Sequence, residues 1–196
     1  MTTPVIGVLA LQGDFAEHIE MLRSLGVDSI EIRLPAQLTQ IDALIIPGGE
    51  STTITRLLDI YALREPIRQL GLDGLPIWGT CAGAIVLAKE ATDLDRPNLA
   101  LMDITVRRNA FGRQRDSFEE DLRIPELGEA PFHALFIRAP IIERVGAEVE
   151  VLATLADGTI VAAREGALLA TSFHPELTGD ARFHAMLAHS VVGRRS

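Results

Sequence analysis

Gly79-Thr80-Cys81-Ala82-Gly83 is the stretch around which this 196-residue chain is organised. A short apolar run at 75–78 precedes it, and residues 84–90 follow it with the composition of a helix. The single cysteine of the chain therefore lies at a tight strand-to-helix turn, with a glycine two positions away on each side. This is the pattern of a nucleophile elbow, and glycine suits it because the backbones approach closely enough for a Cβ to clash.

The turn also gives Cys81 a chemical setting. We expect the helix to begin at the sulfur, where its unpaired N–H groups and the positive end of its dipole favour a thiolate over a thiol. The competing interpretation is a small buried cysteine in a glycine-containing turn, because free cysteine is among the most buried residue types. This stretch alone supports both interpretations equally, so the rest of the chain must decide.

The first half of the chain alternates strands with helices. The continuous apolar run at 5–11 is typical of a strand buried on both faces. Asp14 followed by Glu17 resembles a capping box that opens a helix. Further strands are expected at 29–34, 43–46 and 75–78, with helices between them. The pattern predicts an α/β fold in three layers, with a mostly parallel, doubly wound (flavodoxin-like) sheet.

The second half is richer in short alternating segments, which predict additional antiparallel strands. These strands are expected at 102–107, 118–124, 132–137 and 167–173, with a hairpin of 148–155 and 159–164 around Ala156-Asp157-Gly158. Asp180 can cap a last helix. No linker, repeat or low-complexity segment interrupts the chain, so we expect one domain over residues 1–196.

Composition excludes several classes of function. The net charge is 18 − 27 = −9, which argues against a nucleic-acid-binding surface. A single cysteine excludes an internal disulfide and fits a reducing cytoplasm. The N-terminus lacks the basic start of a signal peptide, and no apolar run is long enough to cross a bilayer. The sequence contains no CxxC, HExxH, GxxxxGK[ST] or GxGxxG motif, so we expect no metal or nucleotide site.

Two further motifs follow predicted strands, at the edge of the sheet where ligands bind in open α/β folds. The first is Pro47-Gly48-Gly49-Glu50-Ser51, whose glycines free backbone N–H groups to approach an anion or an oxyanion. Taken alone, it is better explained as a Gly-Gly turn with Ser51 as an ordinary helix N-cap. The second is Ser172-Phe173-His174-Pro175-Glu176.

His174 and Glu176 are two positions apart, so an extended backbone places both side chains on the same side. Pro175 biases His174 toward that extended geometry. A carboxylate beside an imidazole fixes its tautomer and raises its basicity. The sequence therefore suggests a Cys81–His174–Glu176 triad, although it does not show that His174 reaches Cys81.

The other histidines are set aside. Three lie in helical patterns, where a surface or core position is the ordinary expectation: His18, His184 and His189. His133 lies near a strand start and has no carboxylate in a similar register, and Glu119-Glu120-Asp121 is interpreted as a solvated acidic stretch.

The three motifs together, in this order and at this spacing, resemble those of class I, triad-type glutamine amidotransferases. Three narrower stretches resemble the family of glutaminase subunits of pyridoxal 5′-phosphate synthase: residues 8–13, 108–119 and 136–140. The resemblance covers nearly the whole chain. Ile85 stands where many members of the wider class carry glutamine, which weakens assignment to the anthranilate, GMP or carbamoyl-phosphate branches and fits the pyridoxal branch.

The resemblance implies a role for each matching residue. Cys81 would be the nucleophile, His174 the general base and acid, and Glu176 the residue that orients His174. The residues implied to bind L-glutamine are Gly48, Gly49, Glu50, Arg108, Ile137 and Arg138. Backbone N–H groups of Gly49 and Ala82 would form the oxyanion hole. The ordinary alternatives are a surface arginine at 108 and, at 138, an arginine paired with an acidic neighbour.

The implied reaction is glutamine hydrolysis through a γ-glutamyl thioester on Cys81, which yields glutamate and ammonia. Ammonia in neutral water is mostly ammonium, which is not a nucleophile, so direct delivery to a second active site is needed. The resemblance names the partner as a (β/α)8-barrel synthase subunit in a hetero-oligomeric complex. The Gly48–Gly49 peptide is a candidate switch, because glycine permits a flip that turns an N–H toward or away from the oxyanion. No cofactor is expected in this chain. Two alternatives stay open: another Cys-elbow hydrolase or isomerase, and a non-catalytic regulatory subunit.

Overall fold

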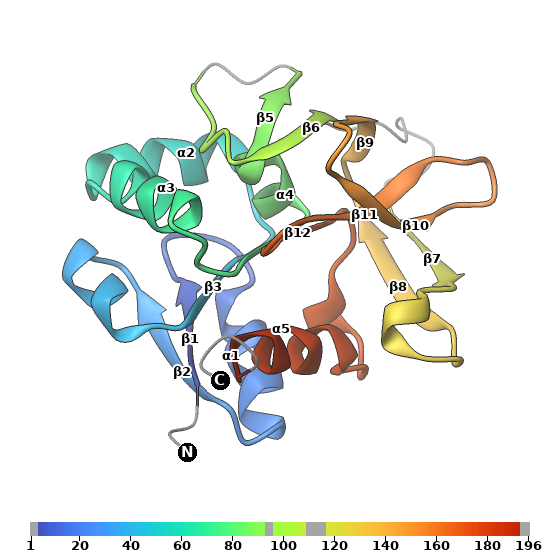
Figure 1. Cartoon of the computed structure of the whole chain (residues 1–196), viewed down its shortest axis with the longest axis horizontal. Coiled ribbons are helices and arrows are strands. Elements are labelled where there is room, and N and C mark those ends of the chain that lie inside the picture. The colour runs from blue at the N-terminus through green and yellow to red at the C-terminus, as the bar shows by residue number, and fades with distance from the viewer. Residues whose placement is uncertain (1–3, 93–95, 109–116, 193–196) are drawn as a thin grey trace.

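The computed structural model describes residues 4–92, 96–108 and 117–192 (Figure 1). Its described strands form a ten-stranded mixed sheet and a separate two-stranded sheet. The larger sheet has the order β2 (Asp28–Ile32), β1 (Val5–Leu9), β3 (Ala43–Ile46), β4 (Ile77–Thr80), β12 (Leu168–Thr171), β11 (Ile160–Glu165), β9 (Ile141–Val145), β6 (Met102–Arg107) and β5 (Ala88–Ala91), with β10 (Glu150–Thr154) paired to β11. The smaller sheet pairs β7 (Ser117–Leu122) with β8 (Phe132–Ile137).

The predicted fold class is confirmed, and its parallel part positions the site. The neighbouring pairs from β2 to β12 are all parallel. β3, β4 and β12 are buried along their whole length, as their predominantly apolar sequences predict for a sheet covered on both faces. β12 comes from the far end of the chain but pairs directly with β4, with Thr171 opposite Thr80. This pairing brings the segment after Thr171 beside Cys81.

Helices cover both faces of this sheet (Figure 1). α1 (Phe15–Ser24) and α5 (Arg182–Val192) pack on one face, where Leu22 and Phe183 join the core cluster of Ile6, Ile45 and Trp78. The second core cluster lies on the opposite face and includes residues of α2 (Ser51–Ile60), α3 (Arg64–Leu72) and α4 (Ala82–Leu87). Three short 3-10 segments complete the described elements: η1 (Pro35–Gln40), η2 (Pro125–Leu127) and η3 (Pro175–Leu177).

The predicted antiparallel strands of the second half are also present. β10 and β11 form the expected hairpin, in which the Leu155 N–H donates to the Thr159 carbonyl at 2.9 Å. Gly158 takes a φ of 86° in its turn. The sequence analysis did not identify β9, which pairs with both β6 and β11.

The helix predicted over residues 84–90 is wrong in its second half. α4 ends at Leu87, and residues 88–91 form β5, which pairs with β6. The carbonyls of Val86 and Leu87 accept hydrogen bonds from the N–H groups of Leu99 and Leu101, at 2.9 and 3.1 Å. These carbonyls are therefore bonded to the segment that leads into β6 rather than to a further helical turn. Tertiary pairing overrides the helix propensity of Ala88-Lys89-Glu90. No helix among the described residues has the length and apolar character needed to cross a membrane.

Phe183 tests the packing that holds α5 to the sheet. It is fully buried and stacks on Trp78, with ring centroids 5.6 Å apart. We expect Phe183→Ala to lower the free energy of unfolding by about 3–5 kcal/mol, the range for deleting a buried phenylalanine ring. Urea unfolding followed by the fluorescence of Trp78, the only tryptophan, measures this change.

Leu72→Ala is the matched control, because Leu72 is 57% exposed and its loss is expected to cost under about 0.5 kcal/mol. Equal effects for the two variants would contradict this assignment of the core.

Candidate active site

Cys81 occupies a strained elbow between β4 and α4. Its φ of 48° and ψ of −104° lie outside the regions that residues with a side chain prefer, at a cost of about 1–3 kcal/mol. Its N–H donates to the Thr171 carbonyl on β12 at 2.8 Å. A Cβ on Gly79 would lie 2.4 Å from the Gly83 backbone, and one on Gly83 would lie 1.9 Å from the Ile46 carbonyl oxygen. Both glycines are therefore required by the close approach of backbones.

His174 follows β12 after Ser172 and Phe173, and it is anchored at both its backbone and its ring. Its N–H donates to the Leu135 carbonyl of β8 at 2.9 Å. Its Nδ1 lies 2.7 Å from Oε1 of Glu176, whose side chain is fully buried in η3. The two side chains two positions apart thus meet, as the sequence analysis predicted.

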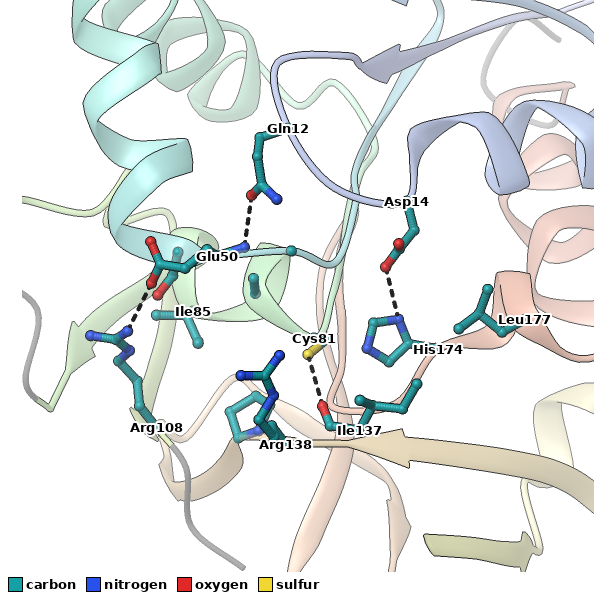
Figure 2. A pocket seen from close by; sticks show the side chains of 14 residues that line it. Gln12, Asp14, Glu50, Cys81, Ile85, Arg108, Ile137, Arg138, His174 and Leu177 are labelled. Carbon is teal, nitrogen blue, oxygen red and sulfur yellow. Dashed lines mark hydrogen bonds and ion pairs between the residues drawn. The ribbon is translucent and has the colours of Figure 1, made fainter. Parts of the chain in front are cut away.

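Asp14 is a second carboxylate at the same imidazole, with its Oδ2 3.4 Å from Nδ1 of His174 (Figure 2). Burial lowers the pKa of His174, but hydrogen bonds with Asp14, Cys81 and Glu176 outweigh burial and raise that pKa above its usual 6.5. Burial raises the pKa of Glu176, opposed by its hydrogen bond with His174. The predicted capping box is wrong, because the Asp14 side chain makes no hydrogen bond to the start of α1 and faces His174 instead.

Cys81 and His174 lie side by side in a cavity of about 450 Å³ (Figure 2). The sulfur is also 3.9 Å from the carbonyl oxygen of Ile137. The cavity is lined by Gln12, Asp14, Gly49, Glu50, Ser51, Cys81, Ala82, Ile85, Arg108, Ile137, Arg138, Pro140, His174 and Leu177. Two predicted site residues do not line it: Glu176 is buried behind His174, and Gly48 backs the imidazole, where a Cβ would lie 2.5 Å from Cε1.

Glu50 forms the far wall of the cavity and is itself the N-cap of α2. Its carboxylate accepts from the N–H groups of Thr52 and Thr53 at 3.3 and 2.7 Å, so the N-cap role suggested for Ser51 is wrong. Burial opposes ionisation of Glu50, but hydrogen bonds from Thr52 and Thr53 lower its pKa to about 2. Arg108 contacts this carboxylate at 3.1 Å (Figure 2), and its motif continues into residues 109–116, which lie outside the described residues.

The Gly48–Gly49 peptide is held against the turn after β1. The Gly48 carbonyl accepts from the Asp14 N–H at 3.1 Å, and the Gly49 N–H points the opposite way because the peptide is trans. The approach is tight, because a Cβ on Gly13 would lie 1.7 Å from the Gly48 oxygen. On the other side, the Gln12 side-chain oxygen accepts from the Glu50 N–H at 2.7 Å.

Arg138 also has an unusual backbone, with a φ of 42°. It follows β8 directly, and its side chain points into the cavity beside Cys81 (Figure 2). Backbone strain of this kind clusters at functional sites, so the φ of Arg138 makes this arginine a candidate site residue.

Sequence reasoning missed three residues around the triad: Gln12, Asp14 and His18. The first two follow β1, so the rule that sites lie at strand carboxyl ends could have found them. His18 gave no such signal, because its helical position is also that of an ordinary core residue. It is fully buried, with Nε2 3.4 Å from Oε2 of Glu176.

The prediction that His133 has no carboxylate in a similar register is wrong. The antiparallel pairing of β7 with β8 places Asp121 directly opposite His133. The imidazole contacts Asp121 at 2.8 Å and Glu119 at 3.1 Å. The side chains of this acidic stretch are therefore exposed, but two of them are paired with His133.

No metal site is expected from the sequence motifs. Among the described residues, one group of three potential metal ligands lies close together, with ligand atoms within 4.8 Å of one another: Asp14, His174 and Glu176. In this structure both carboxylates face Nδ1 of His174, so the group is accounted for by the imidazole it surrounds.

Comparison with known proteins gives consistent relatives. The sequence profile of the SNO glutamine amidotransferase family matches residues 8–193. A pyridoxal 5′-phosphate synthase subunit PdxT from Herpetosiphon aurantiacus is 65% identical over 92% of this chain and 97% of its own. A PdxT from Salinispora arenicola is 55% identical over 97% and 98% of the two chains.

Solved structures agree with this comparison. A crystal structure of a glutamine amidotransferase superposes with a TM-score of 0.90 at 49% identity and covers 95% of this chain and 98% of that one. A putative GMP synthase protein from Thermoplasma acidophilum covers 100% and 97% with a TM-score of 0.74, but at 18% identity it supports the fold alone.

Gly48 provides a test of the contact between His174 and Cys81. We expect Gly48→Ala to displace the imidazole, because the new Cβ would lie 2.5 Å from Cε1 and Glu176 limits where the ring can move. Alkylation of the single cysteine by iodoacetamide should slow by about 10²-fold, the lower end of what a positioned base contributes. Gly179→Ala is the control, because a Cβ there meets no atom within 4 Å. An unchanged alkylation rate in a folded Gly48→Ala protein would exclude the His174–Cys81 contact.

Proposed function

The chain belongs to the SNO glutamine amidotransferase family, and we propose that it is the glutaminase subunit of a pyridoxal 5′-phosphate synthase. It hydrolyses L-glutamine to L-glutamate and ammonia. The observation that carries this proposal is the meeting of Cys81, His174 and Glu176 at one cavity. The cavity, at about 450 Å³, has the size typical of small-molecule sites.

The reaction begins at the sulfur of Cys81, which attacks the side-chain amide carbon of glutamine. His174 takes up the thiol proton as general base and returns it to the leaving ammonia as general acid. Glu176 holds the Nδ1–H of His174 at 2.7 Å and thereby presents Nε2 to the sulfur. A γ-glutamyl thioester remains on Cys81, and water activated by His174 releases glutamate.

The oxyanion of each tetrahedral intermediate is stabilised by backbone N–H groups of Gly49 and Ala82. Ala82 opens α4, where N–H groups lack intrahelical partners. Loss of one such donor typically slows a reaction by about 10²–10³. The hydrogen bond from Asp14 to the Gly48 carbonyl fixes the direction of the Gly49 N–H, and glycine at both positions permits this peptide to flip as a switch.

The charged groups of glutamine are bound away from the sulfur. Glu50 is ionised and exposed to the cavity, which suits the α-amino group, and Arg108 beside it suits the α-carboxylate. Gly49, Ile137 and Arg138 complete the proposed substrate site, with Ile137 and Arg138 contributing partly through their backbones, and Gly48 supports this site from behind the imidazole of His174.

The product requires a partner. Ammonia must reach a second active site before it is protonated in bulk water, and we propose that it passes to a (β/α)8-barrel synthase subunit in a hetero-oligomeric complex. The curated relatives are named as subunits of a pyridoxal 5′-phosphate synthase, which supports this partner. A reducing compartment suits a catalytic thiol, and we place the complex in the cytoplasm.

Glutamate release from glutamine, measured for the chain alone and with its matching synthase, tests the proposal. We expect strong activity with the synthase, weak activity without it, and none for Cys81→Ala. The Cys81→Ala chain must still assemble with the synthase, so that lost turnover is not lost docking. Absence of glutamate from the assembled wild-type complex would favour another Cys-elbow hydrolase or isomerase, or a regulatory role. Activity retained by Cys81→Ala would exclude the proposed nucleophile.

A further inference from the structure

Two histidines lie buried behind the triad and have no role in the reaction described above. His18 on α1 and His184 on α5 are both fully buried, and Nδ1 of His18 lies 2.9 Å from Nε2 of His184. Both rings meet Trp78 edge-on, at centroid distances of 5.6 and 4.9 Å. On its other side, Nε2 of His18 lies 3.2 Å from the Thr80 hydroxyl.

His18 also faces the catalytic carboxylate. Its Nε2 is 3.4 Å from Oε2 of Glu176, and neither side chain has any exposed surface. Oε1 of the same carboxylate is occupied by His174 at 2.7 Å, whereas Oε2 makes no standard hydrogen bond with any described residue. A buried carboxylate oxygen without a donor is costly. Whether Nε2 of His18 carries a proton therefore decides whether Oε2 faces a donor or a lone pair.

The titratable groups around His18 are Glu176, His174 and His184, and they favour a neutral ring. Burial, then the neighbouring His184 and His174, lower the pKa of His18 well below 6.5. Burial also lowers the pKa of His184 to about 3. A neutral imidazole carries its single proton on one nitrogen and accepts on the other.

The contacts select one tautomer for each ring. With its proton on Nε2, His184 donates to Nδ1 of His18 and leaves only a lone pair on its own Nδ1, the atom that has no partner among the described residues. His18 then carries its proton on Nε2, facing Glu176 and Thr80. The opposite arrangement would bury an unpaired N–H on His184 and turn a lone pair of His18 toward the carboxylate, both of which are unfavourable.

We propose that His18 is a positioning residue, whose Nε2–H is donated to Oε2 of Glu176 and orients the carboxylate so that Oε1 meets His174. This inference rests on the proposed glutaminase function. A hydrogen-bonded path then runs from His184 through His18 and Glu176 to His174, and α1 and α5 support the triad from behind. Thr80 shares the Nε2–H and limits rotation of the ring.

Two variants separate positioning from packing. His18→Leu fills a similar volume but removes the donor, whereas His18→Gln can offer an amide N–H to Oε2. For the complex with the synthase, we expect His18→Leu to lower kcat for glutamine by about 10–100-fold, as for outer partners of metal-bound histidines. KM should be unchanged, and His18→Gln should recover most of the loss. The exposed His189 provides the control His189→Leu, with wild-type kcat. Full kcat in His18→Leu, or equal losses in the Leu and Gln variants, would overturn the proposal.

A second readout does not depend on turnover. In ¹⁵N-histidine NMR spectra of the chain, we expect His18 as the neutral Nε2–H tautomer and a shift of the His174 Nδ1–H resonance in His18→Leu. An Nδ1–H tautomer or an imidazolium at His18 would overturn the proposal. If the wild-type complex released no glutamate, the glutaminase function would fail while these spectra still decided whether His18 donates to Glu176.

Discussion

The close approach of three backbones at Cys81 is the constraint on which the rest of the structure depends. The cysteine is held at a φ of 48°, which is unfavourable by itself. Gly79 and Gly83 allow β4, α4 and β3 to come together without a Cβ between them, and the Thr171 carbonyl accepts the Cys81 N–H. The last of these contacts requires β12, which lies far beyond β4 along the chain. The elbow is therefore a product of the whole parallel sheet and not of its own five residues.

The same sheet places the partners of the sulfur. β12 delivers His174 and Glu176, and the turn after β1 delivers Asp14, which contacts His174 with its side chain and the Gly48 carbonyl with its N–H. Asp14 thus links His174, which we propose as the general base and acid, to the peptide that we assign to the oxyanion hole. A shift of this turn would affect base and oxyanion donor together. This linkage gives a physical route by which a docked partner could control the reaction without touching the sulfur.

Much of this arrangement could be predicted from the sequence. Buried strands are recognisable as apolar runs, and the elbow, the Gly48–Gly49 turn and the His174–Glu176 pair each have a local sequence pattern, even though the geometry of the elbow depends on the whole sheet. The failures have a different origin. Residues 88–91 favour a helix locally but pair with β6, and Asp14 has the pattern of a helix cap but faces His174. His133 meets carboxylates of the paired strand β7, and His18 meets the carboxylate of Glu176 in η3. In each case the deciding contact comes from a different element of the fold, which a local sequence pattern does not reveal.

If Cys81 carries a γ-glutamyl thioester during turnover, hydroxylamine should intercept it, because hydroxylamine attacks thioesters in competition with water. The complex with the synthase is supplied with glutamine and increasing hydroxylamine, and both γ-glutamyl hydroxamate and glutamate are measured. We expect hydroxamate to rise as glutamate falls, with neither product formed by Cys81→Ala. Glutamate release at an undiminished rate without any hydroxamate would mean that water attacks glutamine directly, and it would contradict the role assigned to the elbow.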